Sequence, residues 1–127
     1  MVIAVSKAVK KGSVSAFSLI ELLIVVAIVS LLLAIAIPQF IAYRTGSVDS
    51  QMKSDLKNAA TAMEGYYGEY KIYPTSVSAI IAVGFRQTDG MSFSITITSP
   101  TSFTMTASKP SGSQPSFTYD STTGNID

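Results

Sequence analysis

The feature that most constrains this chain is a stretch of 22 residues, Leu22 to Tyr43, that contains no charged side chain. It lies between Glu21 and Arg44 and consists mainly of Leu, Ile, Val and Ala. An α-helix rises about 1.5 Å per residue, so about 20 residues cross the roughly 30 Å hydrocarbon core of a bilayer. The stretch therefore predicts one membrane-spanning helix.

A basic segment precedes the apolar stretch. Residues 1–16 contain Lys7, Lys10 and Lys11 and no acidic residue, which is typical of a leader ahead of an apolar run. Lysines and arginines that flank a span favour the cytoplasmic side, and Arg44 alone opposes them. We therefore expect the chain after the span to face outward.

The residues after the span change to an amphipathic helical pattern. Apolar side chains recur at spacings of 4, 3, 4, 3 and 4, as on one side of a helix: Met52, Leu56, Ala59, Met63, Tyr66 and Tyr70. The polar residues between them are assigned to the solvent side: Lys53, Asp55, Lys57, Asn58 and Glu64. Pro38 is expected to kink the long helix rather than end it, because apolar residues continue on both sides. Thr45-Gly46-Ser47 is a second weak point, because residues of low helix propensity there weaken the helix and could break it.

A short second helix is expected after Pro74. Thr75 or Ser76 is suited to cap it, and Gly84 is suited to its C-terminal end, so the helix is expected to run through Val83.

The remaining residues alternate with the period of two that strands have. Strands are expected at 92–98 and 102–108, joined by a hairpin at 99–101, with a third at 116–119 and a short last one at 125–127. A sheet this small needs a cover on its apolar face. The amphipathic helix supplies that cover.

The expected fold class is therefore α+β. A long N-terminal α-helix, with an apolar transmembrane half and an amphipathic half, packs on a small antiparallel sheet of three or four strands. This divides the chain into residues 1–16 as the leader, residues 17–43 as the apolar helix, and residues 44–127 as the amphipathic helix with its sheet.

Composition argues against several classes of function. The chain has no cysteine and no histidine, which excludes disulfides, thiolate or imidazole metal sites and histidine-based catalysis. A net charge of +1 without a basic stripe argues against nucleic-acid binding. No serine or threonine has a base beside it, and no P-loop is present. We expect neither an enzyme nor a cofactor or metal.

The residues "FSLIELLIVVAIVSLLLAIAIPQFIAYR", Phe17 to Arg44, resemble the N-terminal signature of type IV pilins and of the related pseudopilins of type II secretion. In that family a basic leader is cut just before a methylatable residue, usually Phe, with Glu as the fifth mature residue and Pro as the twenty-second. Counted from Phe17, those places fall on Glu21 and Pro38. The resemblance implies cleavage between Ala16 and Phe17 and N-methylation of Phe17.

Two positions depart from the family pattern. Ala16 stands where the family usually has Gly, so slower cleavage is expected. Ser30 stands where the family commonly has a Gly that loosens the helix. A serine there can bond back to the carbonyl four residues earlier and bend the helix, so Ser30 and Pro38 are the expected sites of bending.

Glu21 is the carboxylate that the resemblance explains. A carboxylate in hydrocarbon costs about 2.5–3.5 kcal/mol on insertion scales and usually has a partner, although the positive end of a helix favours one in its first turn. The resemblance implies that a neighbouring subunit's Phe17 α-amine becomes that partner once the apolar helices pack into a filament. An unpaired buried charge is costly, so this pairing would set the axial register.

The resemblance also implies partners and a location. The chain would be a single-pass precursor in the inner (cytoplasmic) membrane and then the subunit of a homopolymeric pilus on the cell surface. A prepilin peptidase, an assembly ATPase and a membrane platform would be needed. Adhesion, twitching motility, DNA uptake and secretion are all open to such a filament.

Three alternatives are kept. A conventional secretory signal cut at Ala34-Ile35-Ala36 would release a soluble β domain that starts at Ile37. A pseudopilin or minor pilin would share the apolar helix, but major pseudopilins often carry a carboxylate-rich calcium loop, and only Asp120 and Asp127 follow Asp89. The third alternative is electron transport along filaments through aromatic residues, although aromatic rings at such spacing more often pack against other side chains. The residues concerned are Phe17, Phe40, Tyr43, Tyr66, Tyr67, Tyr70 and Tyr73.

Overall fold

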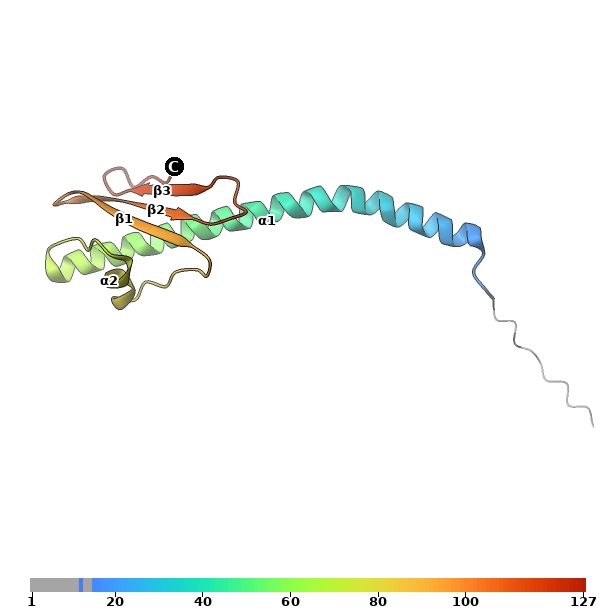
Figure 1. The fold of residues 1–127 in the computed structure, drawn as a ribbon, viewed down its shortest axis with the longest axis horizontal. Coiled ribbons are helices and arrows are strands. Elements are labelled where there is room, and N and C mark those ends of the chain that lie inside the picture. Colours follow the sequence, from blue (N-terminus) through green and yellow to red (C-terminus); the bar gives the residue numbers. More distant parts are fainter. Residues whose placement is uncertain (1–11, 13–14) are drawn as a thin grey trace, which may run out of the picture. The chain divides into compact units, whose positions relative to one another are not determined.

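The computed structural model describes residue 12 and residues 15–127 (Figure 1). Their elements, in chain order, are α1 (Leu19–Tyr70), α2 (Val77–Ala82), β1 (Ser92–Ser99), β2 (Ser102–Ser108) and β3 (Ser116–Asp120). The leader lysines Lys7, Lys10 and Lys11 lie outside the described residues. The described residues separate into two compact units, one that ends at Ile37 and one that runs from Pro38 to Asp127. A boundary between residues 43 and 44 stays a prediction.

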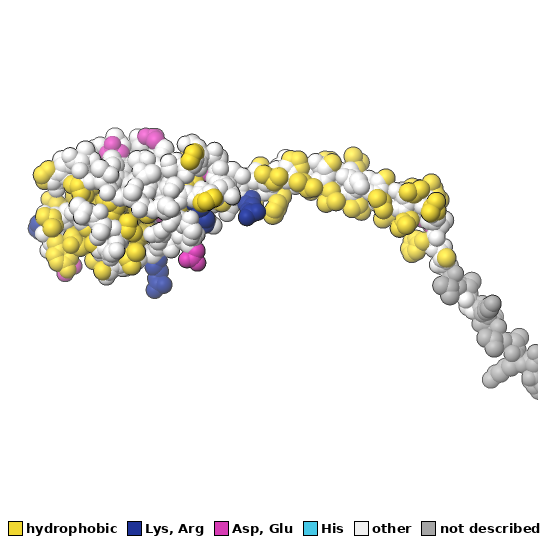
Figure 2. Space-filling model, in the orientation of Figure 1, with side chains coloured by type: hydrophobic (Ala, Val, Ile, Leu, Met, Phe, Trp, Pro, Cys, Tyr) yellow, Lys and Arg dark blue, Asp and Glu magenta, His cyan; other side chains and the backbone are white. Residues whose placement is uncertain are grey.

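The described part of the first unit is the apolar start of α1. All residues from Leu19 to Ile37 are exposed, and hydrophobic side chains cover the helix there in Figure 2. Among the described residues, α1 is the one helix that is long and apolar enough to cross a membrane. This agrees with the sequence, because Glu21 and Ser30 are the only polar residues of this run, which leaves no side of the helix suited to water.

Helix α1 continues through both expected weak points. Pro38 lies inside it, and so do Thr45, Gly46 and Ser47. The Thr45 hydroxyl donates to the Ile41 carbonyl at 2.9 Å, so this polar side chain bonds within its own helix instead of opening it. The expected kink at Pro38 stays a prediction.

The second unit is built around the amphipathic part of α1. Met52, Leu56, Ala59 and Met63 are fully buried, as the spacing predicts. Tyr66 is only half-buried and Tyr70 is 53% exposed, so the core side of α1 ends about one turn earlier than expected. The two tyrosines pack on each other, with ring centroids 4.4 Å apart.

The sheet is three-stranded and antiparallel in the order β1-β2-β3 (Figure 1). Its register pairs Ile95 with Met105 and Ala107 with both Phe93 and Phe117. The buried residues of the central strand β2 include Phe103, Met105 and Ala107, and full burial of a large apolar side chain contributes roughly 1.5–3 kcal/mol. The α+β fold class is confirmed.

The expected last strand is reduced to an isolated bridge. Tyr119 pairs with Ile126, and Thr118 exchanges backbone hydrogen bonds with Asp127 at 2.7 and 2.9 Å. Asp120 begins the turn before it and accepts the Gly124 N–H at 2.8 Å.

The short helix α2 matches its expected signals. Ser76 is its N-cap and its side chain accepts the Ala79 N–H, while Val83 is the C-cap. Gly84 follows with φ at 108°, a conformation that favours glycine. The helix contributes Ile80 to the core.

Asp55 corrects the sequence analysis. It was assigned to the solvent side but is only 4% exposed. Thr88 supplies both hydrogen bonds to its carboxylate, from the backbone N–H at 2.8 Å and from the hydroxyl at 2.9 Å. Position 55 lies three residues after Met52 and therefore on the same side of the helix; a burial pattern that considers only apolar side chains misses it.

A second carboxylate anchors another loop to α1. Asp49 accepts the Ser113 N–H at 2.8 Å and also its hydroxyl. The loop approaches closely at Gly112, where an added Cβ would lie 2.7 Å from Met52 Cε and 2.8 Å from Asp49 Oδ1. Two aspartates of α1 thus fasten the irregular loops that precede β1 and β3.

Candidate functional site: the start of the apolar helix

The residues predicted to act in processing and assembly lie in or just before the first half of α1. Ala16 and Phe17 precede the helix and are exposed, Phe17 by 85%. Glu21 is in the first turn, and Ser30 and Pro38 lie further along the same helix. The expected cleavage position is therefore in the non-helical segment next to the helix start.

Glu21 is held by Ser18, a residue that the sequence analysis did not single out. The Ser18 N–H donates to Glu21 Oε2 at 2.8 Å, and the Glu21 N–H donates to Ser18 Oγ at 3.2 Å. This reciprocal pair is a capping box, which occupies two backbone donors at the start of a helix. The spacing Ser-x-x-Glu at 18–21 was the signal that could have found it.

Ser30 uses its hydroxyl within its own helix. Its Oγ donates to the Val26 carbonyl at 2.7 Å, the bond back by four residues that a serine in an apolar helix can make. The hydroxyl is therefore satisfied without a polar neighbour. A part for Ser30 in bending the helix stays a prediction.

The side chains around these residues form a continuous apolar surface. From Leu19 to Tyr43 every residue is exposed, and Glu21 is the only charged residue among them. Soluble monomers rarely expose contiguous apolar patches larger than a few hundred Å². This half of the helix therefore requires a cover of lipid or of other apolar helices.

Comparison with known proteins identifies the family. The model of the prokaryotic N-terminal methylation motif matches residues 12–37. The chain is 35% identical over 97 residues to the type IV wide pilus major component PilA4 of Thermus thermophilus, and the alignment covers 76% of this chain and 74% of that protein. The chain belongs to the type IV pilin family.

Two further similarities agree with this membership. The pilin is 47% identical over 57 residues to the type IV major pilin protein PilA of Myxococcus xanthus, an alignment that covers 45% of this chain and 26% of that one. Its fold is similar to that of the TTHA1221 type IV pilin protein from Thermus thermophilus, with a TM-score of 0.51 and 21% identity over 62% of this chain and 94% of that chain. The second similarity concerns the fold alone.

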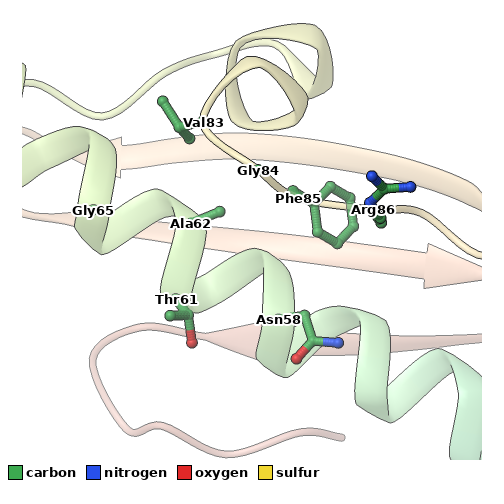
Figure 3. A pocket seen from close by; sticks show the side chains of 8 residues that line it. All are labelled: Asn58, Thr61, Ala62, Gly65, Val83, Gly84, Phe85 and Arg86. Atoms are coloured by element: carbon green, nitrogen blue, oxygen red, sulfur yellow. The ribbon is translucent and has the colours of Figure 1, made fainter.

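The second unit of the pilin, residues 38–127, is called the head below. It contains an open groove between α1 and the segment after α2 (Figure 3). Its volume is about 420 Å³, and α1 lines it with Asn58, Thr61, Ala62 and Gly65, opposite the segment Val83 to Arg86. Arg86 is the only charged residue of this lining, so no acid and base face each other there. Among the described residues, no group of three or more carboxylates is placed to hold a metal ion. The groove gives no support to catalysis.

The aromatic rings of the pilin head pack into its structure. Tyr73 contacts Tyr67 at 4.5 Å and Phe103 at 4.7 Å between ring centroids, and Phe103 lies 6.0 Å from Tyr119. The Tyr73 hydroxyl donates to Glu64 Oε1 at 3.0 Å. Burial, together with this hydrogen bond, raises the pKa of Tyr73 to about 12. These contacts fasten the segment after α1 to the core. Tyr67, Tyr73 and Tyr119 therefore serve in packing.

Proposed function

We propose that this pilin is the major structural subunit of a type IV pilus, made as a membrane-anchored precursor, cut between Ala16 and Phe17 and polymerised through its apolar helix. One observation carries the proposal: the helix that begins within the methylation motif exposes every side chain from Leu19 to Tyr43. A surface of this kind is suited first to a bilayer and then to a bundle of identical helices. The relatives named as major pilus components support the same function.

The motif and the helix start together support the proposed cleavage position. The methylation-motif match runs from residue 12 to residue 37 and so covers Ala16, Phe17 and the following apolar run. It supports a cut ahead of the run over a secretory cut after Ala36, which would discard the helix. Methylation of Phe17 would leave its α-amine charged and able to pair.

Pairing between subunits gives Glu21 its role. Inside a helix bundle its carboxylate would lose contact with water, and the stretch Leu22 to Tyr43 offers no cation. The α-amine that cleavage creates on Phe17 of a neighbouring subunit would supply the opposite charge. A subunit inserted one step out of register would leave both charges unpaired in an apolar surrounding, which is strongly unfavourable.

Assembly would depend on proteins other than the pilin. A peptidase would remove the leader at the cytoplasmic face of the inner membrane, and an ATPase with a membrane platform would drive extraction of the helix. The sequence carries no P-loop of its own. The finished filament would lie on the cell surface, with the heads outward and the apolar helices inside.

Intact mass and N-terminal sequencing of filaments sheared from cells test the proposal. The expected result is a chain that begins with Phe17 carrying one N-methyl group and makes up most of the filament protein. A chain that begins at Ile37, or its absence from sheared filaments, contradicts the proposal. If the chain is present only as a small fraction of the filament protein, the major role is wrong and a minor pilin remains.

A further inference from the structure

The Glu21 side chain is already oriented within its own chain. Its Oε2 accepts the Ser18 N–H at 2.8 Å, while Ser18 Oγ accepts the Glu21 N–H at 3.2 Å. Ser18 directly precedes Leu19, the first residue of α1. One residue therefore both caps the helix and holds the carboxylate on which the proposed assembly depends.

The capping box leaves the other carboxylate oxygen available. Among the hydrogen bonds of the described residues, those of the Glu21 carboxylate involve Oε2 and not Oε1. An ionised carboxylate has about four acceptor positions, so Oε1 can accept from a further donor. Because the side chain is ordered before a partner arrives, less conformational entropy is lost when the partner binds.

The capping box also provides acceptors for backbone N–H groups at the helix start. The first N–H groups of a helix have no acceptor within the helix, and in an apolar surrounding such groups must find one. Ser18 Oγ and Glu21 Oε2 serve two of these donors from within the subunit. An incoming cation then meets an oxygen that no backbone group of the described residues occupies.

We infer that Ser18 is a positioning residue for filament assembly. It holds the Glu21 carboxylate so that Oε1 receives the α-amine of Phe17 from a neighbouring copy of this chain. The inference rests on the proposed function, because it presupposes that Glu21 pairs between subunits. Ser18 acts through Glu21 and not by contact with the amine.

The first experiment replaces Ser18 in the full-length chain. Each variant is co-expressed with the wild-type chain, and mass spectrometry of sheared filaments gives its share relative to its share of mature, cleaved subunit in the membrane. Ser18→Ala is expected to lower incorporation between about twofold and thirtyfold, the equilibrium equivalent of losing an N-cap. Ser18→Thr and Ser18→Asn keep a side-chain acceptor and are expected to restore it.

Ser50→Ala is the matched control. Ser50 is an exposed serine of the same helix, and its hydroxyl donates to the Gly46 carbonyl at 2.9 Å. It is expected to incorporate like the wild type. Wild-type incorporation of Ser18→Ala would overturn the inference, and so would failure of both Ser18→Thr and Ser18→Asn to restore it.

A second experiment separates positioning of Glu21 from a merely structural cap. Ser18→Ala is combined with Glu21→Gln, and the double variant is compared with Glu21→Gln alone in the same co-expression assay. If Ser18 acts through Glu21, the two incorporate equally. If Ser18→Ala lowers incorporation by the same factor in both backgrounds, Ser18 only starts the helix and the inference is wrong.

The same measurements distinguish failure of the inference from failure of the proposed function. If Glu21→Gln incorporates like the wild type, the pairing between subunits is wrong, and the inference falls with it. If Glu21→Gln incorporates poorly and Ser18→Ala incorporates normally, the pairing stands and the inference alone is wrong.

Discussion

Thr88 donates two hydrogen bonds to the buried carboxylate of Asp55, from its backbone N–H at 2.8 Å and from its hydroxyl at 2.9 Å. Thr88 lies in the connection between α2 and β1. The Asp55 carboxylate therefore fastens that connection to α1. A buried charged group needs its hydrogen bonds, because removal of a partner leaves its desolvation uncompensated. The stability of the head therefore depends on a buried polar contact as well as on its apolar core.

Removing the Thr88 hydroxyl tests this contact. Thr88→Ala is expected to lower the free energy of unfolding by about 1–3 kcal/mol, because it leaves a buried carboxylate short of one donor. Urea unfolding of the full chain in detergent, followed by tyrosine fluorescence, measures the change. Thr98→Ala, at an exposed threonine of β1, is the control and is expected to change stability by less than about 0.5 kcal/mol. Equal effects at the two positions would contradict the prediction.

Gly112 tests the close approach of its loop to α1. An added Cβ would lie 2.7 Å from Met52 Cε and 3.0 Å from the Gln114 carbonyl oxygen, so Gly112→Ala is expected to cost about 1–3 kcal/mol through overpacking. The matched control is Gly68→Ala, where nothing lies within 4 Å of the added Cβ. Alanine is the better helix former, so this control is expected to stabilise α1 by roughly 0.5–1 kcal/mol. The two glycines should therefore respond with opposite signs in the same unfolding assay.

Tyr73 makes the stability of the head sensitive to high pH. Its pKa is raised from 10.0 to about 12 by burial and by its bond to Glu64, so the folded state keeps a proton that the unfolded state loses. The contribution to stability is fully present below about pH 10 and is lost as the pH rises toward about 12. Urea midpoints measured across this range should fall less steeply for Tyr73→Phe, which cannot ionise, than for the wild type. If the urea midpoints of the wild type and of Tyr73→Phe fall equally with pH, groups other than Tyr73 cause the loss of stability.

Glu21→Ala separates membrane insertion from assembly. The variant is expected to insert and to be cleaved, because removal of a charge does not oppose insertion of an apolar helix, but to yield far less filament than the wild type. Immunoblots of membrane and sheared fractions measure both steps, and Glu69→Ala, at an exposed position of α1, is the control. A normal filament yield would remove the pairing argument.

Ala16→Gly tests the cleavage position. It restores the residue that the family pattern usually has before the cut, so leader removal is expected to accelerate while the mature chain still begins at Phe17. A pulse-chase experiment measures the rate, and N-terminal sequencing checks the product. A rate unchanged from the wild type would show that Ala16 does not limit processing.

Residue spacing was sufficient to predict most of the fold. The charge-free stretch predicted the apolar helix, and the alternation around Ile95 and Met105 predicted two strands in the correct pairing. These predictions worked because burial of apolar side chains dominates both elements. The capping of α2 was predicted by its local chemistry at Ser76 and Gly84.

The features that were missed are contacts between polar groups. Asp55 was assigned to solvent because it is polar, although its spacing places it on the core side of α1. Its partner, Thr88, is 33 residues away in the chain, and no local pattern predicts such a bond. The box of Ser18 and Glu21 was local and could have been predicted, but Glu21 was considered as a charge and not as a helix cap. Helix α1 is continuous at Thr45, whose hydroxyl donates to the Ile41 carbonyl, whereas the sequence left a break there open.

The hydrogen bond of Ser30 to its own helix affects how the subunit can move from the membrane into a filament. Its hydroxyl already donates to the Val26 carbonyl, so neither lipid nor a neighbouring helix has to provide an acceptor for it. Transfer of this part of the helix from one surrounding to another therefore breaks no hydrogen bond at Ser30. Around Ser30 the helix can therefore move or rotate against its neighbours without exchanging hydrogen bonds with them.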